Sequence, residues 1–281
     1  MDDTQAARQE RRLEADSAES HFAAYAQPLV DEALEHAAAL KANSDADVLH
    51  KLRIALRRLR SLLWAYRPLL GRELDDQQRE RFKSLAGAAG KTRDWDILTE
   101  LLIETLGARE APTERLRAAR GAALDDSREA LSHAGIQKVL RGALADASGA
   151  LQDQAGGPTS LKRFARKRVA SAEKSLSQRL RRAGRAKRSD YAAYHDVRKA
   201  GKKVRYLLEF FGPLLKKKQL KTAKRLKKLQ KRFGTLNDVV ASEELLRANR
   251  GVFGTDRDAE AAFKALEKQR KRRVRAASKL L

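Results

Sequence analysis

The chain has 281 residues and no cysteine, which excludes a disulfide framework and thiolate metal ligands. Its N-terminal segment MDDTQAARQERRLEAD is polar, and no apolar run approaches the length that spans a bilayer. Neither a secretory signal nor a membrane span is therefore predicted, and we expect a soluble cytoplasmic protein. The net charge is +24, and all of the excess lies from Pro158 onward, where 38 basic residues face 11 acidic ones. An excess of this size favours a polyanionic partner.

Apolar residues recur at helical spacing along nearly the whole chain, and no segment alternates as a half-buried strand does. The predicted fold class is therefore all-α. The first half is predicted to form helices at about residues 5–42, 45–67, 73–89, 92–107, 113–133 and 135–152. The second half is predicted to form helices at about residues 160–184, 190–211, 216–233, 236–250 and 256–279.

The segment QAGGPTS, residues 154–160, separates these two sets of helices. Two glycines and a proline in so short a stretch favour a linker. We predict a first helical bundle over residues 1–153 and a second over residues 161–281.

Several helix ends have local causes. Ser44 with Asp47 three residues later has the pattern of a capping box. Pro68 and Pro213 are predicted to stop the helices before them, because proline lacks the N–H that a helix needs. Gly90 and Gly234 are predicted to end the next helices, since glycine readily adopts a left-handed cap.

One helical pattern occurs twice in the chain. Residues 50–70, HKLRIALRRLRSLLWAYRPLL, align with residues 195–215, HDVRKAGKKVRYLLEFFGPLL, and the match resumes between residues 83–102 and 227–246. One departure is Gly201, which stands where the first copy has Leu56 and predicts looser packing in the second copy. The repeat predicts an internal duplication that gives two pseudo-symmetric four-helix bundles.

Each copy places an apolar stripe beside a basic stripe on one helix. The apolar stripes contain Leu52, Leu56, Leu59 and Leu63 in the first copy, and Val197, Val204 and Leu208 in the second. The basic stripes contain His50, Arg53, Arg57 and Arg60, and correspondingly His195, Arg198, Lys202 and Arg205.

Cations in one row repel one another, and the first copy has no carboxylate four residues away on that stripe to relieve the repulsion. Long basic side chains that only cover the edge of a core would explain one such helix. The repetition instead favours an external anion. Guanidinium groups bind phosphate oxygens through two parallel donors, and a row of about 15 Å suits a linear phosphate chain.

The sequence resembles the CHAD domain family, an all-helical family named for conserved histidines. The resemblance is carried by HKLRIALRRLR, by HDVRKAGKKVRYLLEFFGPLL and by the paired segments GKTRD and GTLND, and it covers about residues 20–280. It implies two four-helix bundles around a basic groove or pore, binding of inorganic polyphosphate and association with polyphosphate granules. This would be a stand-alone CHAD protein.

The resemblance and the stripes together give the predicted polyphosphate-binding residues. They are His50, Arg53, Arg57, Arg58, Arg60, Lys83, His195, Arg198, Lys202, Lys203, Arg205 and Lys227, extended by Lys221, Lys224, Lys228 and Lys231. These last four lysines either continue the polyphosphate-binding row or form a solvated helix face. Whether the two histidines bind as cations or only position their neighbours is left open.

The basic stripes hold no cluster of Asp or Glu, and the chain has no phosphate-binding loop of the Walker type. We therefore predict a binding protein without catalytic residues, metal or cofactor, and we interpret Asp94 and Asp238 as structural residues near helix starts. Two other interpretations stay open. One is a nonspecific nucleic-acid binder, although the basic segments lack interleaved aromatic residues, and the other is a granule scaffold that recruits proteins.

Overall fold

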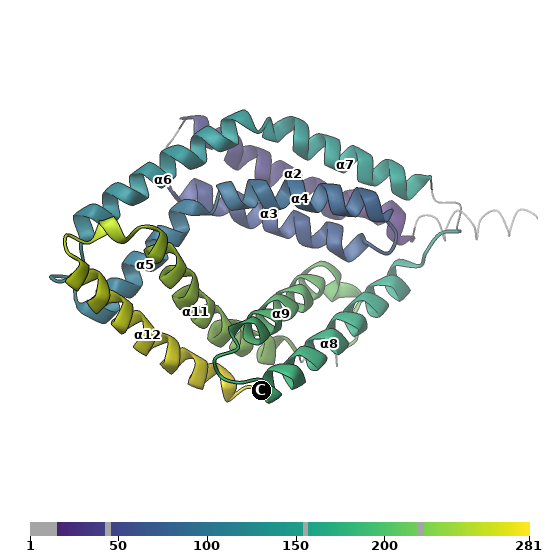
Figure 1. The fold of residues 1–281 in the computed structure, drawn as a ribbon. Helices are drawn as coiled ribbons and strands as arrows, with labels where there is room; N and C mark the ends of the chain where they lie inside the picture. The colour runs from purple at the N-terminus through teal and green to yellow at the C-terminus, as the bar shows by residue number, and fades with distance from the viewer. Residues whose placement is uncertain (1–15, 43–45, 154–156, 218–221) are drawn as a thin grey trace, which may run out of the picture. The chain divides into compact units, whose positions relative to one another are not determined.

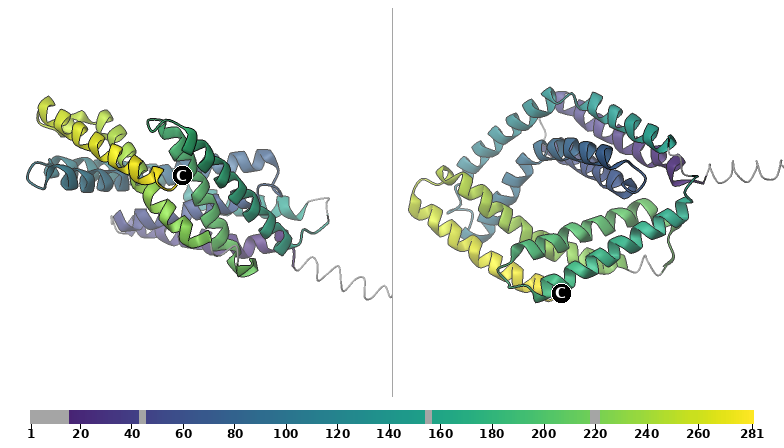
Figure 2. Two further views of the ribbon diagram at one scale, coloured as in Figure 1. Left: turned by 90° about the horizontal axis from the view of Figure 1, so that it is seen from below. Right: turned by 45° about the vertical axis from the view of Figure 1, so that its right-hand side comes forward.

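The structure is a computed structural model that describes residues 16–42, 46–153, 157–217 and 222–281. Throughout these ranges it contains helices and no strand, so the predicted all-α class is confirmed (Figures 1 and 2). The helices are α2 (Ala18–Ala42), α3 (Ala46–Tyr66), α4 (Arg72–Ala88), α5 (Lys91–Leu106), α6 (Thr113–His133), α7 (Ile136–Gln152), α8 (Leu161–Arg185), α9 (Tyr191–Phe211), α11 (Thr222–Ala248) and α12 (Asp256–Ser278), with short 3₁₀ turns at Gly212–Leu214 and Arg250–Val252. No helix in the described ranges combines the length and apolar character needed to cross a membrane.

The chain forms two compact units. Unit 1 comprises Met1–Ala89, Ala130–Glu173 and Lys203–Leu220, and unit 2 comprises Gly90–Glu129, Lys174–Lys202 and Lys221–Leu281. Each unit therefore draws on both halves of the sequence, because α6, α8 and α9 each contribute residues to both. This grouping differs from the predicted bundles over 1–153 and 161–281, and the internal duplication stays a prediction.

In unit 1, α2 and α4 both pack against α3, and α7 packs against α2 and α4 (Figure 1). The predicted apolar stripe of α3 is fully buried here, with Leu52 and Leu56 at 0% exposure. An aromatic cluster completes this core, in which the ring of Tyr66 lies 5.0 Å from Phe22 and 5.1 Å from Phe164. Burial of large side chains of this kind contributes about 1.5–3 kcal/mol each.

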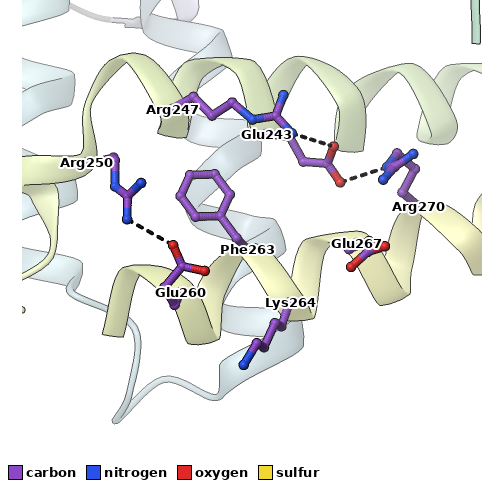
Figure 3. Close-up of a pocket in the computed structure, with 8 residues that line it drawn as sticks. All are labelled: Glu243, Arg247, Arg250, Glu260, Phe263, Lys264, Glu267 and Arg270. Carbon is purple, nitrogen blue, oxygen red and sulfur yellow. Dashed lines mark hydrogen bonds and ion pairs between the residues drawn. The ribbon is translucent and has the colours of Figure 1, made fainter. Parts of the chain in front are cut away.

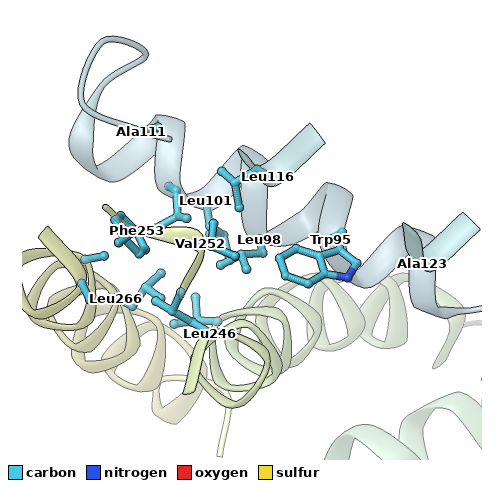
Figure 4. Packing of buried hydrophobic residues seen from close by; sticks show 14 residues of the cluster. Trp95, Leu98, Leu101, Ala111, Leu116, Ala123, Leu246, Val252, Phe253 and Leu266 are labelled. Atoms are coloured by element: carbon cyan, nitrogen blue, oxygen red, sulfur yellow. The ribbon is translucent and has the colours of Figure 1, made fainter. Parts of the chain in front are cut away.

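The core of unit 2 joins α5, α11 and α12 (Figure 4). Leu98, Leu246 and Leu266 come from these three helices in turn and are completely buried. Trp95 lies at one end of the cluster, and Phe253 enters from the turn before α12. A single apolar face on each helix thus suffices to hold the three together.

Some predicted helix ends are confirmed and others are wrong. Helix α3 ends at Tyr66 and α9 at Phe211, each two residues before the proline that was expected to stop it. Gly90 separates α4 from α5 but has a φ of −106°, so it is not the predicted left-handed cap. Ser44 of the predicted capping box lies outside the described residues, as do residues 5–15 of the first predicted helix and 154–156 of the linker.

Gly234 does not end a helix, because α11 runs without a break through the predicted gap between 233 and 236. A glycine inside a helix destabilises it by about 0.5–1 kcal/mol. Phe233 and Leu236 on either side are buried at 1% and 0% exposure, and their packing outweighs that loss. Tertiary contacts therefore override the local stop signal.

Candidate functional site

The basic stripe of α3 lies half-buried beside the leucine stripe of the same helix. His50, Arg53, Arg57 and Arg60 all have intermediate exposure, whereas Leu52 and Leu56 are fully buried. Arg57 Nη2 donates to the hydroxyl of Tyr206, which belongs to α9, at 3.1 Å. The guanidinium groups are thus held at the edge of the unit 1 core by packing and by a neutral partner.

Arg60 lies among other cations in an electrostatically unfavourable position. Partial burial lowers its pKa, and the nearby guanidinium groups of Arg57, Arg79 and Arg53 lower it further. Among the residues that the structure describes, no carboxylate forms an ion pair with Arg60. The folded chain therefore keeps several like charges close together, an arrangement that a bound anion would relieve.

Trp64 adds an aromatic platform to this side of unit 1. The guanidinium carbon of Arg168 lies 4.6 Å from the centre of the indole ring, and Lys203 Nζ also lies 4.6 Å from it. Arg168 Nη2 donates to the backbone oxygen of Trp64 at 2.9 Å. Cation–π contacts of this kind contribute about 0.5–2 kcal/mol and fix the direction of the cations.

Sequence reasoning included Lys203 but missed Arg168 and Trp64. The available signal was a tryptophan on a helix rich in arginine, four residues beyond Arg60, the last member of the predicted basic row. Arg168 had no signal of its own, because it comes from α8 and meets α3 only in the folded unit.

Carboxylates lie within ion-pair distance of Arg58, Lys83 and Arg205. Arg58 Nη1 lies 3.1 Å from Glu32 of α2, and Lys83 Nζ lies 3.0 Å from Glu80. Arg205 pairs with Glu209 four residues later at 3.0 Å and also lies over the ring of Tyr206. These cations are partly neutralised and are weaker candidates for an anion site than Arg57 and Arg60.

In unit 2, His195 is held by a hydrogen-bonded pair from two helices. Its Nδ1 lies 3.1 Å from Asn237 Oδ1, to which the Tyr191 hydroxyl also donates at 2.9 Å. Burial raises the pKa of Tyr191 to about 12, so its hydroxyl keeps the proton that it donates. Because a carbonyl oxygen only accepts, Nδ1 carries a proton and the neutral ring has its acceptor at Nε2.

The charge of His195 is disfavoured in the free protein. Burial lowers its pKa first, followed by Lys199 and Arg198, while the hydrogen bond to Asn237 acts in the opposite direction. The histidine is therefore mainly neutral at neutral pH when no anion is bound.

Asp238 lies in the middle of α11, not near a helix start as predicted, because α11 is continuous. Burial raises the pKa of its carboxyl group, and Arg198, Lys202 and Arg93 act against that rise. A carboxylate from α11 therefore faces the cations of the second stripe. Asp94 does lie in the first turn of α5, as predicted.

Helix α11 packs closely against α9 at Gly201. A Cβ atom at this position would lie 3.0 Å from Leu229 Cδ2, so the absent side chain permits a close approach. The expected loosening of the second copy is thus wrong. The approach brings the lysine row of α11 to the helix that carries His195, Arg198 and Lys202.

The lysine row itself is solvent-exposed. Its described members are Lys224, Lys228 and Lys231. Like Lys227, the separate candidate on the same helix, they are exposed and form no ion pair with a described residue. Lys221 lies outside the described residues. The described predicted residues thus fall into two sets. In unit 1 they lie on α3, on α4 and on the part of α9 that carries Lys203 and Arg205, and in unit 2 they lie on α11 and the part of α9 up to Lys202.

The model of the CHAD domain family matches residues 24–247 of the chain. Among solved structures, the CHAD domain from the plant Ricinus communis is similar over 95% of this chain and 94% of that chain, with 26% identity and a TM-score of 0.74. PptA from Streptomyces chartreusis is similar over 94% and 97% of the two chains, with 15% identity and a TM-score of 0.67, which shows a shared fold alone. No curated protein matches the chain.

Proposed function

The chain belongs to the CHAD domain family, and on this premise we propose that it binds inorganic polyphosphate through the basic rows of α3, α9 and α11. The observation that carries the proposal is the environment of Arg60. Its charge is disfavoured by burial and by three neighbouring arginines, and no described carboxylate offsets it. An external polyanion would supply the missing countercharge.

The arrangement of the cations favours a linear ligand. His50 and Arg60 are ten residues apart on one helix, which corresponds to about 15 Å at 1.5 Å per residue. A small anion would contact only one or two of the guanidinium groups along such a row. A phosphate chain presents oxygens along its whole length, and arginine binds them with paired donors.

The proposed role is binding rather than catalysis, with localisation at cytoplasmic polyphosphate granules. The rows hold cations, a histidine and neutral hydroxyl or amide partners. They therefore provide neutralisation and orientation of phosphates, which a scaffold on a granule surface needs. The carboxylate near them, Asp238, interacts electrostatically with Arg198 and Lys202.

The proposal is tested with fluorescently labelled long-chain polyphosphate at fixed salt. Arg57→Glu with Arg60→Glu should abolish most of the binding, because two cations are lost and two repulsive charges are added. The matched control is Arg109→Glu with Lys138→Glu, an equal charge change at two exposed positions outside the rows. Equal losses in both variants would assign binding to bulk charge and contradict the proposed site.

Competition distinguishes the ligand class. Unlabelled polyphosphate should displace the probe at lower phosphate concentration than duplex DNA or pyrophosphate does. Displacement by duplex DNA at equal charge would instead support nonspecific nucleic-acid binding.

A further inference from the structure

Helix α12 carries a third cationic row that the repeat does not include. At 100° per residue, Lys264, Lys268, Arg272, Arg275 and Lys279 fall within an arc of about 80°, and Lys271 borders it. The row spans fifteen residues, or about 22 Å. Lys279 follows the last helical residue but keeps a helical backbone, with φ −67° and ψ −7°, so it continues the row.

These six cations line one side of an open groove of about 810 Å³ within unit 2. All six are exposed. The other side is formed by Glu104 and Thr105 near the end of α5. Lys271 pairs with Glu267 at 2.9 Å, and Glu104 is engaged by Arg273 at 3.2 Å. The other five cations of the row form no ion pair with any residue that the structure describes.

A neighbouring groove on α12 shows the opposite arrangement (Figure 3). There, Glu243 is almost fully buried and lies 3.0 Å from Arg270 and 3.9 Å from Arg247. Arg250 lies 2.9 Å from Glu260. The arginines of that groove are paired with carboxylates within the fold, and Lys264, which lines both grooves, has no such partner in the part of the chain that the structure describes. In the 810 Å³ groove most of the cations are exposed to solvent without an ion pair among the described residues.

The preference for cations near the C-terminus of a helix explains only some members of this row. Cations near a helix C-terminus are favoured by the helix dipole, but the effect is confined to about the last turn. It accounts for Arg275 and Lys279. Lys264 and Lys268 lie two or more turns earlier, and their alignment with the groove needs another reason.

We propose that this groove is a second polyphosphate track, formed by α12 and separate from the rows of α3, α9 and α11. The inference rests on the proposed function and adds a site to it. Helix α12 begins at Asp256, beyond the residues 24–247 that match the family model.

The geometry favours polyphosphate over nucleic acid. The row is straight, whereas a strand of duplex DNA winds about its axis and completes a turn in roughly 34 Å, so it would leave a 22 Å row partway along. Single-stranded nucleic acid is bound with the help of aromatic side chains that stack on the bases. The residues that line this groove include no aromatic side chain. A flexible chain of phosphates needs only the cations.

Two binding tracks on one protein predict a preference for long polyphosphate chains. A polymer long enough to reach both tracks binds the second one at high effective concentration, so its affinity exceeds that of a short polymer by more than the ratio of their lengths. The preference for long chains should therefore depend on α12.

The test variant is Lys268→Gln, Arg272→Gln and Arg275→Gln, which removes three charges from exposed positions and keeps good helix formers. The matched control is Arg109→Gln, Arg117→Gln and Lys138→Gln, also at exposed positions. Affinity for long-chain polyphosphate is measured as a function of sodium chloride. We expect the α12 variant to lose about tenfold in affinity and its log–log salt slope to become shallower by about 2, from about 0.7 per lost contact. The control should keep the wild-type slope.

A footprint on the unmodified protein provides a second measurement that no folding defect can affect. Lysine acetylation mapped by mass spectrometry should show protection of Lys264, Lys268 and Lys279 when polyphosphate is added, and none at Lys138. Equal acetylation of the α12 lysines with and without polyphosphate would overturn the second track.

The outcomes separate this inference from the proposed function. Absence of polyphosphate binding by the wild-type chain would overturn both. Wild-type binding that the α12 variant retains with an unchanged slope would overturn the second track alone. Equal protection of these lysines by single-stranded DNA alone, at equal phosphate concentration, would overturn the assignment to polyphosphate and indicate a nucleic-acid groove.

Discussion

Helices α3 and α9 carry similar basic rows in different electrostatic surroundings. Beside the α3 row, Arg57 meets a neutral hydroxyl, and the charge of Arg60 is opposed by other arginines. Beside the α9 row, Asp238 faces Arg198 and Lys202, and His195 is fixed by Asn237. The same pattern in the sequence thus places Arg60 among other cations in one row and puts a carboxylate near Arg198 and Lys202 in the other, so the two rows should contribute unequally to anion binding.

The largest expected effect comes from reversing charges in the two rows separately. Arg57→Glu with Arg60→Glu should weaken polyphosphate binding by roughly 100-fold or more, at about 1.5–3 kcal/mol for each charged hydrogen bond lost. Arg198→Glu with Lys202→Glu should weaken it less, because Asp238 already offsets part of that charge. The measurement is fluorescence anisotropy at fixed salt, with circular dichroism to check the fold. Equal losses in the two variants would show that Asp238 makes no difference between the rows.

Removal of Asp238 should make the second row resemble the first. Asp238→Asn deletes the carboxylate that faces Arg198 and Lys202, so affinity for polyphosphate should rise by about 2–10-fold, as one more unit of local positive charge implies. Asp256→Asn is the matched control, since that side chain is 95% exposed in the same unit. A rise of the same size in both variants would assign the effect to net charge.

His195 should give binding at the second row a pH dependence. Burial and nearby Lys199 lower its pKa in the free protein, and bound phosphates would favour its protonated form. Binding should then take up protons, so affinity rises as pH falls through the region below about 6.5. The stability of the free protein has the opposite pH dependence. The pKa of His195 is lower in the folded chain than in the unfolded chain, so the unfolded chain binds the proton more readily. The free energy of unfolding therefore falls as pH falls through that region.

Proton uptake is measured by calorimetry in buffers of different ionisation enthalpy. His195→Gln should remove its share of the uptake, and His50→Gln reports on the corresponding position of α3. Uptake that persists unchanged in both variants would exclude the histidines from the charged part of binding.

The smallest expected effect is a difference in stability between variants at two nearby arginines of α3. Arg58→Gln removes the ion pair with Glu32 and should lower the free energy of unfolding by about 0.5 kcal/mol. Arg60→Gln removes a charge that its neighbours repel and should leave stability unchanged or raise it slightly. Urea unfolding of the free protein measures both, and a larger loss for Arg60 would contradict the uncompensated cluster.

Residue pattern alone was enough to predict the all-α class, most helix boundaries and the apolar and basic stripes that lie side by side. These features depend on helical periodicity and on proline chemistry, which act within a few residues. The repeat also predicted which helices carry the cations. It did not predict that α11 continues through Gly234, since that depends on the burial of Phe233 and Leu236.

Which cations have a partner depends on contacts between helices that are distant in the chain. Glu32 reaches Arg58 from α2, Arg168 reaches Trp64 from α8, and Asp238 reaches Arg198 from α11. Each partner is far from its cation in the chain, and no spacing rule connects them. The groove on α12 has the same origin, because α5 supplies its second side. Charge neutralisation depends on distances of a few ångströms, and packing sets those distances between distant segments of the sequence.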